Sequence, residues 1–234
     1  MSDKISRSEL KYVLTDAQLA QAENALRRLM RVDRHAGEQR RYTVRSLYFD
    51  DAENTSFYEN ENGNDPREKF RIRVYNGDIS HIQLELKQKQ REKTYKHTCR
   101  ITESQCRDLM AGRPLPVDSA WPPVLQKLLL GMRTRLLRPV VIVQYERYPF
   151  ELPNSDVRVT LDRHLTSSSC VSAFLENSFP VRPVMPLGHQ LMEVKFDHFL
   201  PGDVYSGLSA GHLRRTAFSK YYLCRKYSLW GLLG

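Results

Sequence analysis

The chain has 234 residues, 41% of them hydrophobic and 10% aromatic, and this composition excludes an intrinsically disordered protein. Its 36 Lys and Arg against 27 Asp and Glu give a net charge of +9, which favours an acidic partner such as nucleic acid, an anionic membrane or a phosphate-rich small molecule. No apolar run approaches the roughly 20 residues of a membrane-spanning helix, and no apolar stretch of signal-peptide type opens the chain. The four cysteines lack C-x-x-C spacing, so neither a zinc knuckle nor a dithiol site is indicated, and a cytoplasmic protein is expected.

Few segments show helical periodicity. A helix is predicted over Thr15–Arg31, where Leu19, Ala22 and Leu26 recur at helical spacing and Thr15 or Asp16 can cap the first turn. Further helices are predicted over Thr102–Met110, over Trp121–Leu137 and, on a weaker pattern, over Asp203–Leu213. Phe218–Tyr227 fits a helix or a strand.

Most of the remaining chain has the period of two that is typical of strands. The alternation is plain around Phe70–Val74, Leu84–Lys89, Val157–Asp162 and Met192–Asp197. Further strands are predicted around Ile5–Val13, Tyr42–Phe49, Thr94–Arg100 and Pro139–Phe150. Thr166–Gly188 contains proline breaks and three consecutive serines, which predict an irregular excursion.

Each alternating strand has one apolar face and one charged face. An antiparallel sheet with one solvated face explains a single strand of this kind. Taken together, however, the charged faces are rich in long basic residues, and a sheet of about eight strands tends to curl or close. A barrel whose apolar exterior is covered by helices directs its charged faces into a lumen, which then needs a polyanion or counter-ions.

Phosphate is the anion that these side chains suit best. Arginine grips phosphate oxygens with a planar fork, whereas lysine acts as a mobile point charge. Arg71 and Arg73 are two residues apart on one strand face, about 7 Å at the usual rise, which matches neighbouring phosphoryl groups. Glu9, Glu85 and Glu193 would repel phosphate unless they hold lysines or a divalent cation, because hard cations commonly bridge carboxylates and phosphates.

Eight short segments in this order resemble the VTC domain, the polyphosphate polymerase branch of the triphosphate tunnel (CYTH-like) superfamily. They are R-S-E-L-K-Y at Arg7–Tyr12, R-S-L-Y-F-D-D at Arg45–Asp51, K-F-R-I-R-V-Y at Lys69–Tyr75, E-L-K at Glu85–Lys87, Q-Y-E-R at Gln144–Arg147, R-V-T-L-D at Arg158–Asp162, M-E-V-K-F at Met192–Phe196 and F-S-K-Y at Phe218–Tyr221. The resemblance implies an α+β fold: a closed eight-stranded antiparallel tunnel with helices outside, formed by residues 1–234 as a single domain.

The resemblance also implies a site. Its phosphate-binding set would be Lys11, Arg71, Arg73, Lys87, Lys96, Arg147, Arg158 and Lys220, with Arg100 as the alternative to Lys96. Among these, Arg71, Arg73, Arg147 and Arg158 would act on the transferred phosphoryl group. Glu193 would bind the metal, Mn²⁺ or Mg²⁺, with Glu9 and Glu85 as further candidates.

The chain departs from the superfamily pattern at two positions. Hydrolases and cyclases of this fold carry E-x-E-x-K on the first strand, whereas this chain has Arg7 at the first glutamate position. Arginine removes a metal ligand and adds a grip on phosphate, which favours the polymerase branch. Ala217 stands where the family often has a lysine, and Arg214 or Arg215 could compensate.

The expected activity is transfer of the γ-phosphate of ATP to polyphosphate, with ATP and polyphosphate or triphosphate as partners. A metal-dependent triphosphatase and a non-catalytic polyphosphate or nucleotide binder remain alternatives. No specific nucleic-acid partner is expected, because aromatic residues are not clearly interleaved on an exposed basic face. The sequence leaves the oligomeric state open.

Overall fold

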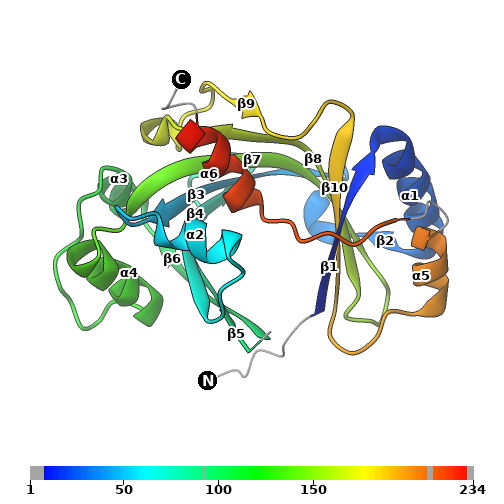
Figure 1. Ribbon diagram of the computed structural model, residues 1–234, viewed down its shortest axis with the longest axis horizontal. Helices are drawn as coiled ribbons and strands as arrows, with labels where there is room; N and C mark the ends of the chain where they lie inside the picture. The colour runs from blue at the N-terminus through cyan, green and yellow to red at the C-terminus, as the bar shows by residue number, and fades with distance from the viewer. Residues whose placement is uncertain (1–7, 92, 210–212, 231–234) are drawn as a thin grey trace. The chain divides into compact units, whose positions relative to one another are not determined.

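The computed structural model describes residues 8–91, 93–209 and 213–230 (Figure 1). These ranges contain ten β-strands: β1 (Ser8–Thr15), β2 (Arg31–Val32), β3 (Tyr42–Asp50), β4 (Arg67–Tyr75), β5 (Ile82–Gln90), β6 (Lys93–Ile101), β7 (Arg138–Glu151), β8 (Arg158–Ser168), β9 (Arg182–Pro183) and β10 (His189–Phe196). The six α-helices of the same ranges are α1 (Asp16–Leu29), α2 (Thr55–Glu61), α3 (Glu103–Met110), α4 (Pro123–Thr134), α5 (Gly202–Ser209) and α6 (Lys220–Trp230). None of these described helices has the length and apolar character that crossing a membrane requires.

The chain divides into two compact units. Unit 1 comprises Met1–Thr43, Tyr145–Leu165 and Met185–Phe218. Unit 2 comprises Val44–Gln144, Thr166–Val184 and Ser219–Gly234. That the whole chain acts as one domain stays a prediction.

The strand pairs of known register are antiparallel: β1 with β10, β10 with β8, β2 with β7, β3 with β4, β4 with β5, β5 with β6, and β8 with β9. The hydrogen-bonded order of the long strands is β1-β10-β8-β7-β3-β4-β5-β6, an open path in the described part of the chain. The expected α+β class with an antiparallel sheet is therefore confirmed, although this path does not run back to its first strand.

Unit 1 has its own hydrophobic core on one face of its strands. Leu14, Val159, Leu161, Met192 and Val194 supply the sheet side of this core, and α1 and α5 cover it. The helices lie side by side in Figure 1, α1 in blue and α5 in orange. Because side chains alternate along a strand, Glu9, Lys11, Glu193 and Lys195 point to the opposite face.

Unit 2 repeats this arrangement with different elements. Its core joins Phe70, Ile72, Leu84 and Leu86 of the strands to residues of α3 and α4, including Cys106 and Leu128. The alternate residues of the same strands, Arg71, Arg73, Glu85 and Lys87, lie on the other face. In each unit the helices thus cover the apolar side of the strands, as the alternation predicts.

The capping residues predicted from the sequence start two helices. Thr15 and Gln18 form a capping box at α1, with Thr15 Oγ1 accepting from Gln18 N and the Gln18 side chain accepting from Thr15 N. Thr102 and Gln105 do the same at α3. The predicted helices over Thr15–Arg31, Thr102–Met110 and Trp121–Leu137 are present with slightly shorter bounds.

Three local predictions need adjustment. Residues 218–227, which fit either helix or strand, mostly form helix α6. The segment Thr166–Gly188 is irregular only after Ser168, since β8 extends to that residue and β9 follows at Arg182–Pro183. The short helix α2 has no periodic signal in the sequence, and residues 210–212 of the predicted helix Asp203–Leu213 lie outside the described residues.

Candidate functional site

The first basic site lies on the polar face of β4, β5 and β6, within unit 2. Arg71 Nε is 2.6 Å from Glu85 Oε2, and Arg73 Nη1 is 3.7 Å from the same oxygen. Lys96 Nζ is 2.6 Å from Glu85 Oε1. We call Arg71, Arg73, Glu85 and Lys96 the Glu85 cluster. Strand register explains it, because Arg71 is directly opposite Glu85 across β4 and β5.

The Glu85 cluster has an excess of positive charge. The Glu85 side chain is only 1% exposed. Burial alone would raise the pKa of its carboxyl group, but the positive charges of Arg71, Arg73 and Lys96 outweigh burial and hold that pKa well below its usual value. One carboxylate thus remains ionised among three cationic side chains, so these four groups together carry a net positive charge.

Two further predicted lysines lie close to this cluster. Lys87 is on the same strand face as Glu85 and is directly opposite Lys69 on β4 and Lys96 on β6. Lys220 is the first residue of α6. Burial alone would raise the pKa of the Tyr48 hydroxyl, but the positive charges of Arg71, Arg73 and Lys220 outweigh burial and lower that pKa. Arg100, the alternative to Lys96, donates from Nη2 to the carbonyl oxygen of Ser80 at 2.9 Å. Of the two, Lys96 is the one that pairs with Glu85.

The second site lies on the polar face of β1, β10, β8 and β7 in unit 1. Arg147 donates from Nε to Asp162 Oδ1 at 2.7 Å and from Nη2 to Asp162 Oδ2 at 2.8 Å. Its Nη2 is also 3.6 Å from Glu193 Oε2. Burial alone would lower the pKa of Arg147, but the charge of Asp162 and the groups around it raise it well above its usual value.

Lysines and carboxylates continue this site across β1 and β10. Lys195 Nζ is 3.4 Å from Glu193 Oε2 and 3.9 Å from Glu9 Oε1, and Lys11 Nζ is 3.5 Å from Glu9 Oε1. Lys11 Nζ also donates to the carbonyl oxygen of Phe218 at 2.8 Å. We call Glu9, Lys11, Arg147, Asp162, Glu193 and Lys195 the Glu193 cluster. Its three cations and three carboxylates balance in formal charge, whereas the Glu85 cluster has a net positive charge.

The carboxylates of the Glu193 cluster give a partial fit to a divalent cation. Glu9 and Glu193 reach the same ammonium group, Lys195 Nζ, so their oxygens converge on one cationic position. The described residues hold no group of three His, Cys, Asp or Glu side chains arranged to bind a metal. Two carboxylates suit a cation such as Mg²⁺ that takes its other ligands from phosphate and water. Glu85, with both oxygens near cations, is arranged to organise basic side chains instead.

Two predicted arginines, Arg158 and Arg7, belong to neither cluster. Arg158 is opposite Lys195 across β8 and β10, but its half-exposed guanidinium is 3.8 Å from Asp33 Oδ2 and 3.9 Å from Glu151 Oε2. Arg7 lies outside the described residues. Near Ala217, Arg215 forms an isolated backbone bridge with Tyr12, next to Lys11, and its side chain is exposed. Arg214 and Arg215 are the two residues suggested to compensate for Ala217. Of these, Arg215 is the one whose backbone pairs with a neighbour of Lys11.

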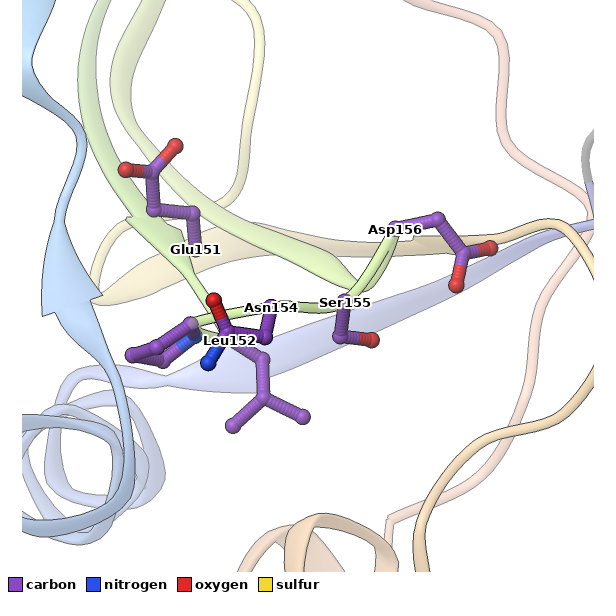
Figure 2. A pocket seen from close by; sticks show the side chains of 6 residues that line it. Glu151, Leu152, Asn154, Ser155 and Asp156 are labelled. Carbon is purple, nitrogen blue, oxygen red and sulfur yellow. The ribbon is translucent and has the colours of Figure 1, made fainter.

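A shallow pocket of about 540 Å³ lies at the turn between β7 and β8 and is lined by Glu151–Asp156. Figure 2 shows that its side chains diverge: Glu151 and Leu152 point in opposite directions, and Asp156 extends away from both. None of the predicted site residues lines it. Because binding sites need polar groups that converge, the two clusters are better candidates than this turn.

Sequence reasoning missed several residues of both sites. Asp162 holds Arg147, Lys195 joins Glu9 to Glu193, and Tyr48 accepts a hydrogen bond from Arg71. Asp162 alternates on the same strand face as Arg158, and Lys195 on that of Glu193, which was a usable signal, whereas β3 carries no predicted site residue beside Tyr48. Their partners, however, depend on the register between strands that are distant in sequence.

Comparisons with known proteins identify the family of the chain. The family model for the VTC domain matches residues 6–229, and no curated protein sequence matches the chain. A candidate adenylyl cyclase from Hippeastrum, described as having a dominant triphosphatase activity, is 12% identical, with a TM-score of 0.51 and coverage of 96% of each chain. A candidate adenylate cyclase from Bacillus halodurans is 13% identical, with a TM-score of 0.48 and coverage of 100% of this chain and 90% of its own. At 12% identity the likeness to the Hippeastrum protein concerns the fold alone, whereas the family match spans nearly the whole sequence. The chain belongs to the VTC domain family.

Proposed function

We propose that the chain is a phosphotransferase that moves the γ-phosphoryl group of ATP onto the end of a polyphosphate chain. The observation that carries this proposal is the Glu85 cluster, in which three cations surround one buried, ionised carboxylate. Such a group attracts an anion strongly and is already ordered without it. Membership of the VTC domain family supports the same activity.

The geometry of the cluster favours a chain of phosphates over a single one. Arg71 and Arg73 are two residues apart on β4, so about 7 Å separates their backbone positions. Arginine forks at this spacing can hold neighbouring phosphoryl groups, while Lys87 and Lys96 add mobile charges. ATP, tripolyphosphate and longer polyphosphate all present such a series.

The reaction requires positioning and charge neutralisation more than covalent chemistry by the protein. A terminal oxygen of the acceptor attacks the γ-phosphorus in line, a new P–O–P bond forms, and the bond to the β-phosphate bridging oxygen breaks to release ADP. The acceptor oxygen is already anionic at neutral pH, so no general base is needed. Arg71 and Arg73 of the Glu85 cluster would hold the transferred group in line and stabilise its charge.

Glu193, with Glu9 beside it, would hold a Mn²⁺ or Mg²⁺ ion in unit 1. A divalent ion bound there would neutralise phosphate charge. Lys195, which now lies near both carboxylates, would then be free to pair with phosphate. Arg7 in place of a carboxylate favours one metal over two, and therefore polymerisation over hydrolysis.

A triphosphatase is the second candidate, and Glu9 and Glu193 favour it, because their two carboxylates converge on one cationic position that could hold the metal of a hydrolysis. The same assay separates these activities. Purified protein is incubated with γ-labelled ATP and Mn²⁺, and the products are resolved on a gel stained for polyphosphate. We expect labelled polymer, and we expect its loss in Arg71→Ala but not in Arg113→Ala, which removes an exposed arginine paired with Asp108. Orthophosphate without polymer would indicate the triphosphatase, and triphosphate binding without turnover would indicate a binder.

A further inference from the structure

Arg71 is held on both sides by neighbouring strands. On one side its Nε donates to Glu85 Oε2 of β5, and on the other its Nη1 donates to the Tyr48 hydroxyl of β3 at 3.0 Å. The register places Tyr48 opposite Arg71 and Arg71 opposite Glu85, so the three side chains form one row across β3, β4 and β5. Two contacts from opposite sides fix the direction of the guanidinium plane.

Tyr48 is itself firmly fixed. It is only 6% exposed, and its ring packs against the ring of Tyr221 at a centroid distance of 5.0 Å. The Tyr221 hydroxyl, at the start of α6, donates to Asp50 Oδ2. Asp50 in turn accepts from the backbone N–H groups of Ser56 and Phe57 in α2. The Tyr48 ring is therefore packed against a residue that Asp50 and α2 hold in place, in addition to its contact with Arg71.

Tyr48 differs from Glu85 in charge. Both accept a hydrogen bond from Arg71, but a neutral phenol orients the guanidinium without cancelling its positive charge. A second carboxylate in this place would balance Arg71 and weaken its attraction for phosphate. A phenylalanine would fill the same space but accept no hydrogen bond.

We propose that Tyr48 is a positioning residue that orients Arg71 for phosphate, so that the grip of Arg71 on the substrate depends on the Tyr48 hydroxyl. This inference rests on the proposed function, because it concerns the same site. Tyr48 acts through Arg71 and not by its own contact with the substrate. Preorganisation of this kind strengthens binding because less side-chain freedom is lost when the ligand arrives.

A double-mutant cycle tests this role. The dissociation constant for tripolyphosphate is measured by calorimetry for the full-length wild type, Tyr48→Phe, Arg71→Lys and the double variant, at a temperature where thermal unfolding shows all four to be folded. We expect Tyr48→Phe to weaken binding about tenfold in the wild-type background and by less than about twofold in Arg71→Lys, which lacks the guanidinium. Tyr58→Phe makes the same chemical change at an exposed tyrosine of α2 and should leave binding unchanged.

The outcomes separate this inference from the proposed function. Equal losses in both backgrounds, or no loss from Tyr48→Phe, would overturn the positioning role even if the wild type forms polyphosphate. The protein could instead bind tripolyphosphate, show strong coupling between Tyr48 and Arg71 in the cycle, and form no polymer. That result would uphold the positioning role and reject the polymerase. A wild type that does not bind tripolyphosphate would overturn both.

Discussion

Arg147 and Asp162 form a two-point ion pair, with Arg147 Nε and Nη2 at 2.7 and 2.8 Å from the two carboxylate oxygens of Asp162. The Asp162 side chain is fully buried, so both of its oxygens are withdrawn from water. Arg147, the partner of Asp162, has its Nη2 3.6 Å from Oε2 of Glu193, a predicted metal ligand. The pair therefore fixes a basic group next to the carboxylate face of unit 1.

Asp162→Asn should destabilise the protein. The amide offers one acceptor and turns its donors toward Arg147, which leaves a buried cation incompletely paired at a cost of about 3 kcal/mol. Urea unfolding measures the change, and Asp203→Asn in α5 is the exposed control. A loss no larger than that of the control would show that the ion pair is not needed for folding.

Glu85 should make the stability of the protein depend on pH. Its pKa is lowered in the folded state from the usual 4.5, so the stabilisation by Glu85 is fully present above pH 4.5 and is lost as the pH falls further toward the lowered value. Glu85→Gln should therefore differ most from the wild type near neutral pH, and the difference should shrink in acid. Unfolding curves at several pH values test this, with Glu53→Gln as the exposed control. A difference that grows in acid would contradict it.

Glu193→Gln should separate metal use from anion binding. We expect metal-dependent turnover to fall at least tenfold, because one proposed ligand loses its charge. Tripolyphosphate binding in the presence of a chelator should not weaken, since the substitution removes a negative charge from the protein. Calorimetry with and without Mn²⁺ measures both effects, and Glu38→Gln is the exposed control. Full metal-dependent turnover in Glu193→Gln would remove Glu193 from the metal site.

Thr15→Ala should destabilise unit 1 by about 1 kcal/mol through loss of the α1 cap. Thermal unfolding measures the effect, and Ser119→Ala, in an exposed turn, should be neutral. An unchanged unfolding temperature would mean that α1 does not depend on its capping box.

Much of the fold follows from local patterns in the sequence. Alternation at Phe70–Val74 and Met192–Phe196 indicates both the strand and its apolar face, and Thr15 and Thr102 mark helix starts because their hydroxyls can reach the free N–H groups of the first turn. Helix α2 has no such pattern. It begins after Asn54, a residue with positive φ, and the buried side chain of Asp50 accepts from its N–H groups. That contact comes from a strand and is not visible as periodicity.

The candidate site was predictable in its residue types but not in its contacts. The basic residues of β4 and the motifs they belong to predict a phosphate site, and this assignment stays a prediction. The choice between Lys96 and Arg100 depends on which one reaches Glu85 across β5 and β6, since both lie on the same strand face. The supporting role of Tyr48 likewise depends on the pairing of β3 with β4. Such cross-strand pairings are fixed by tertiary structure and not by spacing.

The most direct test of the central claim is calorimetric titration of tripolyphosphate into the wild type, Arg71→Ala and Lys96→Ala. If the Glu85 cluster is the phosphate-binding site, each substitution should weaken binding at least about tenfold, because a charge-assisted hydrogen bond is lost. Arg113→Ala, which removes the same charge from an exposed pair, should stay within about twofold of the wild type. Equal binding by all four proteins would contradict the assignment of the site.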